Sequence, residues 1–220
     1  LFRSARAARS PGRAAASSGD GDAAAAAAGD GDAAAAAAAM TDLDTSPHPG
    51  LVFLTTELIL ARAWVSATEG SLTEAARLAH AAAAHAAQAG QPAYEVLAWQ
   101  TAAHFGDGSG ASRLAELTTI VEGPRAPLAT RFATALNNNN PDELTTLSTQ
   151  FEHIGDLIAA IDTAAHAALT YRKHNQRGSA LTQSTRAQTL AHHCGATTPT
   201  LRHAAEPLPL TDREREIVTL

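Results

Sequence analysis

The sequence has few aromatic residues and only one cysteine. Phenylalanine, tryptophan and tyrosine make up 4% of the 220 residues, although 45% of the residues are hydrophobic. Much of that hydrophobic content is alanine, so we expect burial through close contact between helices with small side chains rather than through large apolar anchors. The lone Cys194 excludes an intramolecular disulfide framework and fits a reducing cytosol. The high alanine content and the few aromatic residues favour an all-helical protein.

Long apolar runs and clustered positive charge are also lacking. No run approaches the roughly 18 apolar residues that a membrane span requires, so we expect a soluble, cytoplasmic protein with no membrane partner. The net charge is −6. Phosphate binding needs concentrated positive charge, and the mildly acidic body of the chain argues against a nucleic-acid surface within it.

Residues 1–44 are of low complexity. Gly-Asp pairs alternate with alanine runs at a period of ten between residues 19 and 39. Such runs are shorter than the roughly 12 to 15 residues that a stable isolated helix needs, and they offer no hydrophobic face. We therefore predict a disordered and dispensable linker over residues 1–44, in which Met40 is an alternative start.

From about Thr55 the chain has helical periodicity interrupted by turn residues. The interruptions form two interleaved series with spacings near 34 residues, which is typical of paired helices. We predict about eight antiparallel helices in consecutive hairpins over residues 55–195, without a sheet, in an all-α domain spanning residues 45–206. The first series is Gly70, Gly106 to Gly108, Asn138 and Asn175; the second is Gly90, Gly123, Gly155 and Gly195.

The first and last helix pairs superimpose at an offset of 105 residues, which places Gly70 on Asn175 and Gly90 on Gly195. With their small residues at close spacing, the pairs resemble tetratricopeptide-type repeats. The resemblance implies helical hairpins in a curved stack, with a groove that accepts a protein or peptide.

Apolar or small residues recur at three- and four-residue steps in the two helices near the end of this region, so each helix has one stripe for a neighbour. One stripe contains Leu157, Ile161, Ala164, Ala168 and Tyr171; the next contains Ala180, Ser184, Ala187, Ala191 and Cys194. Within NNNNPDEL, Asn140 is predicted to cap a helix that has Pro141 in its first turn.

Several histidines raise the question of metal binding. His192, His193 and Cys194 are consecutive, and His203 is nearby. Zinc sites usually take ligands from two separated pairs, because adjacent residues on a helix point about 100° apart. The preference of histidine for a helix C-terminus explains this cluster better.

Catalytic patterns are missing as well. We interpret His80, His85 and His166 as packing or solvated residues, and GDGSG at residues 106–110 lacks the Lys-Ser/Thr ending of a phosphate loop. We therefore expect no catalytic, metal-binding or cofactor-binding residue, no cofactor and no enzymatic activity in this chain.

Residues 171–205 contain basic residues without a single acid. This run is either a rim that faces DNA or a solvated face. Its members are Arg172, Lys173, Arg177, Arg186 and Arg202.

The chain ends on LTDREREIVTL, which reads as the start of a helix. Thr211 and Glu214 can bond to each other's backbone amides as a capping box. Ile217, Val218 and Leu220 supply an apolar side, but one such turn needs packing partners. We interpret residues 207–220 as the beginning of a further domain.

This stretch resembles the first helix of the LuxR-type helix-turn-helix domain, whose signature is LTxREREV. The resemblance implies a structural role for these residues, a base-reading helix located after Leu220, and a DNA-binding domain that works as a homodimer, often with an ATPase upstream. The matching residues are Leu210, Thr211, Arg213, Glu214, Arg215, Glu216, Ile217 and Leu220.

The sequence therefore predicts a bacterial transcriptional regulator of the large LuxR-like kind, in which the helical region is the regulatory or protein-interaction part. One alternative is a tetratricopeptide-like scaffold that binds a protein or peptide in its groove without reading DNA. Another is an enzyme with an upstream catalytic domain, which requires a Walker or cyclase motif before Leu1.

Overall fold

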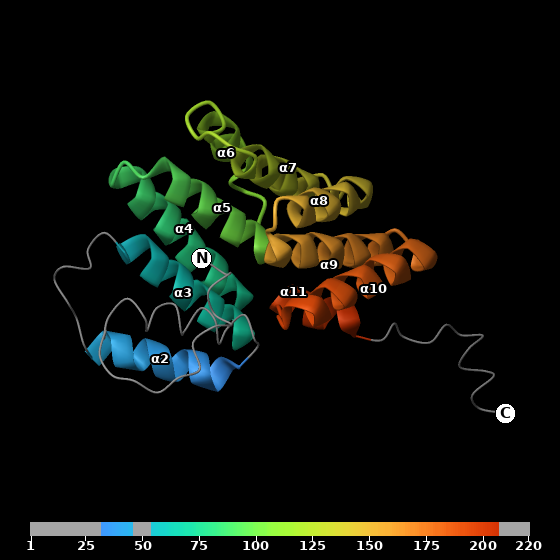
Figure 1. Cartoon of the computed structure of the whole chain (residues 1–220), viewed down its shortest axis with the longest axis horizontal. Coiled ribbons are helices and arrows are strands. Elements are labelled where there is room, and N and C mark those ends of the chain that lie inside the picture. Colours follow the sequence, from blue (N-terminus) through green and yellow to red (C-terminus); the bar gives the residue numbers. More distant parts are fainter. Residues whose placement is uncertain (1–31, 46–53, 207–220) are drawn as a thin grey trace.

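The computed structural model describes residues 32–45 and 54–206. All regular elements in these two ranges are helices, stacked largely as antiparallel hairpins (Figure 1), so the predicted all-α class is confirmed. Residues 55–194 contain eight helices, as the spacing of turn residues predicts. The described helices are α2 (Ala33–Thr45), α3 (Thr55–Thr68), α4 (Leu72–Gln88), α5 (Pro92–His104), α6 (Ala111–Leu117), α7 (Arg125–Asn137), α8 (Pro141–His153), α9 (Leu157–Lys173), α10 (Arg177–Cys194) and α11 (Pro199–Ala205).

Five of the hairpins have the same three-residue turn. The central residue of each turn has a positive φ, and the third residue donates its amide to a carbonyl five positions earlier, as Gln91 does to Ala86 at 2.8 Å. This bond closes a Schellman motif, which favours glycine or asparagine at the centre. The sequence identified four of the central residues correctly and missed the fifth by one position, Asn138 in place of Asn139. The central residues are Gly70, Gly90, Asn139, Gly155 and Asn175.

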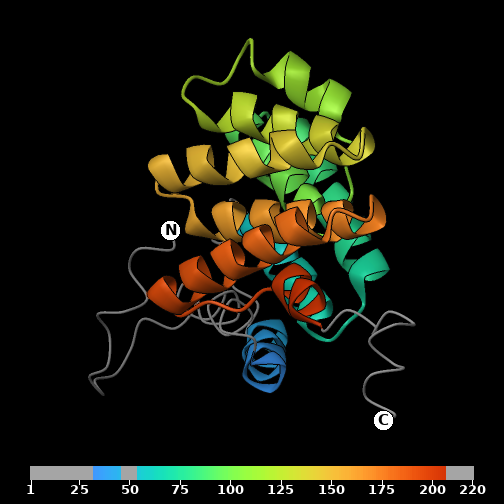
Figure 2. The ribbon, with the colours of Figure 1, turned by 90° about the vertical axis from the view of Figure 1, so that its right-hand side faces the viewer.

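The helices form two layers. The main contacts between helices that are not adjacent in sequence join odd-numbered helices: α3 with α5, α5 with α7 and α9, and α9 with α11. We call α3, α5, α7 and α9 the inner layer, and α4, α6, α8 and α10 the outer layer. Figure 2 shows the short α11, in red, beside α10 and near the teal helices at the start of the array. The last described helix therefore returns to the inner layer.

The prediction that burial depends on small side chains holds for some helices, such as α4 and α9, and not for others. The buried residues of α4 are all alanines, namely Ala75, Ala79, Ala82, Ala83 and Ala86. In α8, by contrast, Leu144, Leu147 and Phe151 are fully buried, and Phe132 of α7 packs against Phe151 with ring centroids 6.1 Å apart. Large apolar side chains therefore serve as anchors in particular helices, such as α7 and α8, rather than throughout the array.

The predicted stripes lie on the faces where helices meet. In α9, however, residues outside the predicted stripe are buried as well. Ile161, Ala164, Ala168 and Tyr171 are buried as predicted. However, α9 contacts α5, α8, α10 and α11, so its other faces are buried as well (Figure 1). The amphipathic pattern of α9 is weak because this helix is surrounded by neighbours.

Helix α2 corrects the predicted linker over residues 1–44 in the part that the structure describes. Asp32 accepts the amide of Ala35 at 2.9 Å and so caps a helix formed by an alanine run that we predicted to be too short. Met40 packs with Ala61 and Val65 of α3. This partner supplies the packing that an isolated alanine run lacks. The rest of the predicted linker lies outside the described residues.

Candidate functional site at the junction of α5, α9 and α11

A histidine and an aspartate form a buried pair between two helices of the inner layer. His104 is in the last turn of α5 and Asp162 is in the middle of α9; both are at least 95% buried. His104 Nδ1 lies 2.8 Å from Asp162 Oδ2. An ionised carboxylate only accepts hydrogen bonds, so this contact places a proton on Nδ1. A carboxylate at this depth must be satisfied by hydrogen bonds.

Helix α11 supplies the second partner of that carboxylate. The hydroxyl of Thr198 donates to Asp162 Oδ1 and accepts the amide of Leu201 at 3.1 Å, which caps α11. Thr200 donates its hydroxyl to the backbone oxygen of His104 at 2.9 Å. Both threonines are buried. The N-terminal turn of α11 is therefore bonded to α5 and α9 by side chains rather than by apolar contact alone.

A second histidine completes the cluster. His166 Nε2 lies 3.0 Å from the backbone oxygen of His104, and its ring packs against Phe132 at 5.8 Å. Loss of hydration lowers the pKa of His166 below its usual 6.5, although Asp162 and the bond to His104 act in the opposite direction. His166 is therefore neutral at neutral pH and donates through Nε2.

A polar network next to this cluster connects α5, α7 and α9. Gln100 donates to Asp156 at 2.9 Å and accepts from Arg125 at 3.0 Å, and Arg125 also pairs with Asp156. Burial alone raises the pKa of Asp156, but the charge of Arg125 and the bond from Gln100 outweigh it and bring the pKa below 3.8. Asp156 also caps α9 by accepting the amide of Ala159. The network holds three inner helices in register.

The order of the groups in this cluster does not suit nucleophilic catalysis. A serine or threonine nucleophile is activated by a base that touches its hydroxyl, while a third group orients that base. Here the carboxylate of Asp162 lies between Thr198 and His104 and bonds to both. The threonine hydroxyl is also engaged with the amide of Leu201. The arrangement instead fixes α11 to the inner layer.

The GDGSG loop brings a serine, a histidine and an aspartate together at the surface. His80 Nε2 lies 2.8 Å from Asp107 Oδ2 and 3.3 Å from Ser109 Oγ. A catalytic triad uses opposite nitrogens of the imidazole for its two partners, whereas one nitrogen serves both here. The contact therefore joins α4 to the loop without activating the serine.

The glycines of this loop have a packing role that the sequence did not reveal. A Cβ at Gly108 would lie 2.4 Å from the backbone oxygen of Ala133, and one at Gly110 would lie 2.4 Å from the ring of Trp99. Asn137 also donates to the backbone oxygen of Gly108 at 2.8 Å. The loop thus packs closely against α5 and α7. This close packing explains Gly108 and Gly110, so no phosphate ligand is needed to explain them.

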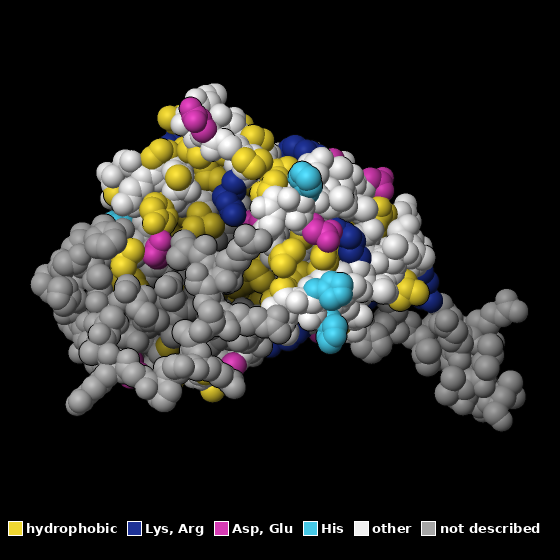
Figure 3. Space-filling model, in the orientation of Figure 1, with side chains coloured by type: hydrophobic (Ala, Val, Ile, Leu, Met, Phe, Trp, Pro, Cys, Tyr) yellow, Lys and Arg dark blue, Asp and Glu magenta, His cyan; other side chains and the backbone are white. Residues whose placement is uncertain are grey.

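Three arginines of the basic run between residues 171 and 205 cross-link helices. Arg172 donates to the backbone oxygen of Ala204, and Arg202 donates to that of Thr68 at 3.1 Å. Arg186 bonds to Ser148 at 3.0 Å and pairs with Glu152. On the face shown in Figure 3, Lys and Arg appear as separate patches rather than one continuous surface. Arg172, Arg186 and Arg202 thus have intramolecular partners, while Lys173, Arg177 and Arg202 are exposed, as a solvated face requires.

The consecutive histidines lie where a helix ends. His192 and His193 are in the last turn of α10 and exposed, and Gly195 follows with φ 71°. Cys194 is half-buried. Within the described ranges, no three His, Cys, Asp or Glu side chains gather closely enough to hold a metal ion.

The sequence did not identify His104, Asp162, Thr198 or Thr200 as important. One signal was available, because Asp162 is the only charged residue in the apolar stretch LIAAIDTAAHAAL. An isolated acid on a buried helix needs a partner, but the sequence does not show that the partners come from positions 104 and 198.

Every residue assigned to the LuxR-type first helix lies outside the described residues: Leu210, Thr211, Arg213, Glu214, Arg215, Glu216, Ile217 and Leu220. Comparison of the chain with protein-family models, with curated proteins and with solved structures finds no match. No helix in the part of the chain that the structure describes is long and apolar enough to cross a membrane.

Proposed function

We propose that this chain is the regulatory helical region of a bacterial LuxR-type transcriptional regulator. The proposal rests first on the resemblance of Leu210 to Leu220 to the opening of the LuxR-type DNA-binding domain. Helix α11 ends at Ala205, five positions before Leu210. The helical array and the DNA-binding domain are therefore separated by a very short segment.

The observation that carries the proposal is the position of α11 on the inner layer. Its side chains bond to Asp162 of α9 and to the backbone of α3 and α5. A shift among these three inner helices therefore changes the contacts that hold the segment leading to Leu210. This geometry is suited to transmitting a change in the array to a following domain, because the array and that domain both act on the position of α11.

The alternative proposal is a scaffold that binds a protein and does not read DNA. A hollow of about 480 Å³ between α7 and α8 supports it, since the walls are largely apolar: Pro124, Pro127, Leu128, Thr149, Gln150, His153 and Ile154. In this proposal the partner binds at that edge of the array, because α11 covers part of the inner layer.

Electrophoretic mobility shifts distinguish the two functions. The 220-residue chain should show no sequence-specific DNA binding, because LuxR-type domains read bases with a later helix. A version extended by about fifty native residues should bind its operator, with an affinity that falls steeply as salt is raised. Specific binding by the short chain would place the reader elsewhere, and none by the extended chain would favour the scaffold.

A substitution in the extended protein tests the role given to Thr211. Replacing Thr211 by alanine should destabilise the DNA-binding domain by about 1 kcal/mol through loss of the cap. Operator preference should not change, since the first helix of the domain does not touch bases. An altered preference would show that this helix reads DNA.

A further inference from the structure

Helix α11 does not continue the hairpin pattern of the array. The turn from α9 to α10 takes three residues, as four others do, whereas four residues from Gly195 to Thr198 lead from α10 into α11. This connection lets the chain cross to the inner layer, where α11 contacts α9 and α10 (Figure 2). The helix packs on α9 and α10, and its Thr200 and Arg202 also bond to the backbone of α5 and α3, which lie far away in sequence.

The contacts of α11 are those of a bound peptide. Leu201 and Ala204 insert as apolar side chains and are at least 93% buried. Hydrogen bonds then fix its direction: Thr198 bonds to Asp162 near its start, and Arg202 donates to the backbone oxygen of Thr68 further along. Side chains of the surface also bond to the end of the helix, because Arg172 and Ser184 both donate to the backbone oxygen of Ala204.

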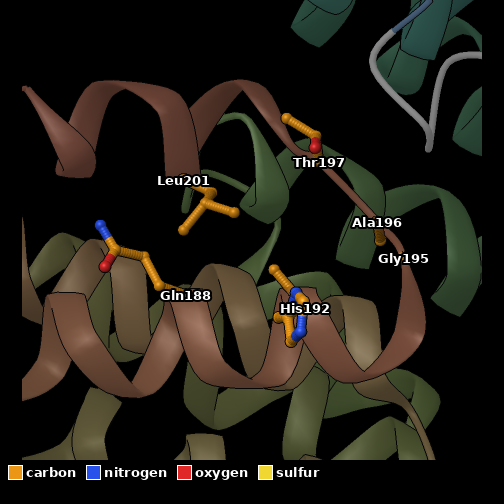
Figure 4. Close-up of a pocket in the computed structure, with 7 residues that line it drawn as sticks. Gln188, His192, Gly195, Ala196, Thr197 and Leu201 are labelled. Atoms are coloured by element: carbon orange, nitrogen blue, oxygen red, sulfur yellow. The ribbon is translucent and has the colours of Figure 1, made fainter.

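The surface is larger than α11 fills. A hollow of about 350 Å³ lies between α11 and the last turns of α10, open beside Leu201. In Figure 4, Leu201 extends from α11 toward α10, where Gln188 and His192 stand on either side.

The attachment of α11 has a limited energetic basis. A seven-residue helix is too short to be stable alone, so α11 depends on its contacts with the array. These involve two buried apolar side chains and a few hydrogen bonds. Elements with few buried apolar contacts open at a lower free energy than the whole domain. A peptide that binds the same surface can therefore compete with α11 when this helix detaches.

We propose that the inner layer carries a docking site for a short helical peptide, and that α11 is its resident occupant. The peptide has a hydroxyl residue as its cap, proline in its first turn, an aliphatic residue three positions after the cap and arginine four positions after it. Thr198, Pro199, Leu201 and Arg202 supply this pattern in α11. The proposal does not depend on DNA binding.

Competition with a synthetic peptide tests this proposal in the full chain. The probe is the acetylated and amidated peptide ATTPTLRHAAE, which reproduces residues 196–206. Isotope-labelled protein is titrated with unlabelled peptide, and amide signals of residues 200–205 report whether its own α11 is displaced. The resident helix competes at an effective concentration near millimolar for a short tether, so the wild-type chain should bind the peptide only weakly.

A variant that weakens the resident helix should expose the site. Leu201→Ala in the protein should increase its affinity for the wild-type peptide by at least about tenfold, since the competing helix loses its main apolar contact. The peptide with the same substitution should bind at least about tenfold more weakly. Leu181→Ala is the matched control, because Leu181 is 69% exposed on α10.

Several results would overturn the proposal. One is an α11 in the Leu201→Ala protein that stays as protected from hydrogen exchange as in the wild type. Another is equal binding of the two peptides, which indicates non-specific association. If Leu201→Ala prevents folding, Arg202→Ala replaces it, because this substitution removes only the bond to Thr68. The proposal then requires the same gain in peptide affinity from Arg202→Ala. The titration contains no DNA, so its failure leaves the LuxR-type assignment untouched.

Discussion

Helices α4 and α8 occupy equivalent places in the outer layer but are packed differently. Helix α4 buries alanines alone, whereas α8 buries two leucines and Phe151. Alanine lets helix backbones approach closely and loses no side-chain entropy, but each residue removes little apolar surface from water. Large side chains give more burial from fewer positions. The same hairpin geometry is therefore reached by close approach in α4 and by interlocking side chains in α8.

The largest expected effect breaks the packing of α8. Phe151→Ala removes a fully buried ring that contacts Phe132, and it should lower the free energy of unfolding by about 3–5 kcal/mol. Urea denaturation measures the loss. Ile120→Ala is the control, because a side chain that is 62% exposed should change stability by less than about 0.5 kcal/mol. A small loss for Phe151→Ala would mean that α8 does not depend on its large side chains.

In α4 the destabilising change should be the addition of a larger side chain, whereas in α8 it is the removal of one. Ala79→Leu inserts a larger side chain where no surface is exposed and should cost about 1–3 kcal/mol. Ala84→Leu on the exposed side of the same helix provides the control, and its unfolding midpoint should stay near that of the wild type. Equal tolerance at both positions would show that α4 is not closely packed.

Helix caps sharpen the comparison between α4 and α8. The side chain of Asn140 accepts the amide of Glu143 at 3.1 Å at the start of α8, whereas Ser71 at the start of α4 makes no such bond. Asn140→Ala should therefore cost about 1 kcal/mol. Ser71→Ala should cost less, and thermal unfolding of the two variants measures the difference. Similar losses would contradict the assigned caps.

Acid should affect the second half through His166. Its pKa is lowered in the folded protein, so the unfolded chain binds the proton more readily, and stability is lost as pH falls below about 6.5. Between pH 7.5 and 6.0 this single group accounts for at most about 0.8 kcal/mol. His166→Gln should reduce this dependence in urea titrations at both pH values, with exposed His192→Gln as the control. An unchanged dependence in His166→Gln would mean that another group is responsible.

The helical hairpins were predictable because their signals are local. Gly70 and Gly155 mark turns that only a few residue types adopt, and Asn140-Pro141 marks a helix start whose cap the structure confirms. Helix α2 was missed because its stability comes from α3, a contact that the alanine run itself does not encode. The packing of Phe132 on Phe151 was missed for the same reason, since composition gives an average over all helices.

The candidate site was not predictable because its members are distant in sequence. His104 and Asp162 belong to different helices of the inner layer, and Thr198 joins them only after the chain has crossed from α10. Histidine, threonine and arginine also have many surface roles, so their identity alone gives no signal. Arg202 illustrates this point, because a residue that fits a DNA-facing rim bonds to the backbone of Thr68 instead.

The contacts of α11 also determine when the domain can be completed during synthesis. Most hairpins close between residues that leave the ribosome close together in time, and such local contacts form quickly. Thr200 and Arg202, however, meet partners 96 and 134 positions earlier in the chain. Until α11 is made, the nascent array carries Asp162 without the hydroxyl of Thr198. We therefore expect α11 to dock late in folding, after the helices that it contacts have formed.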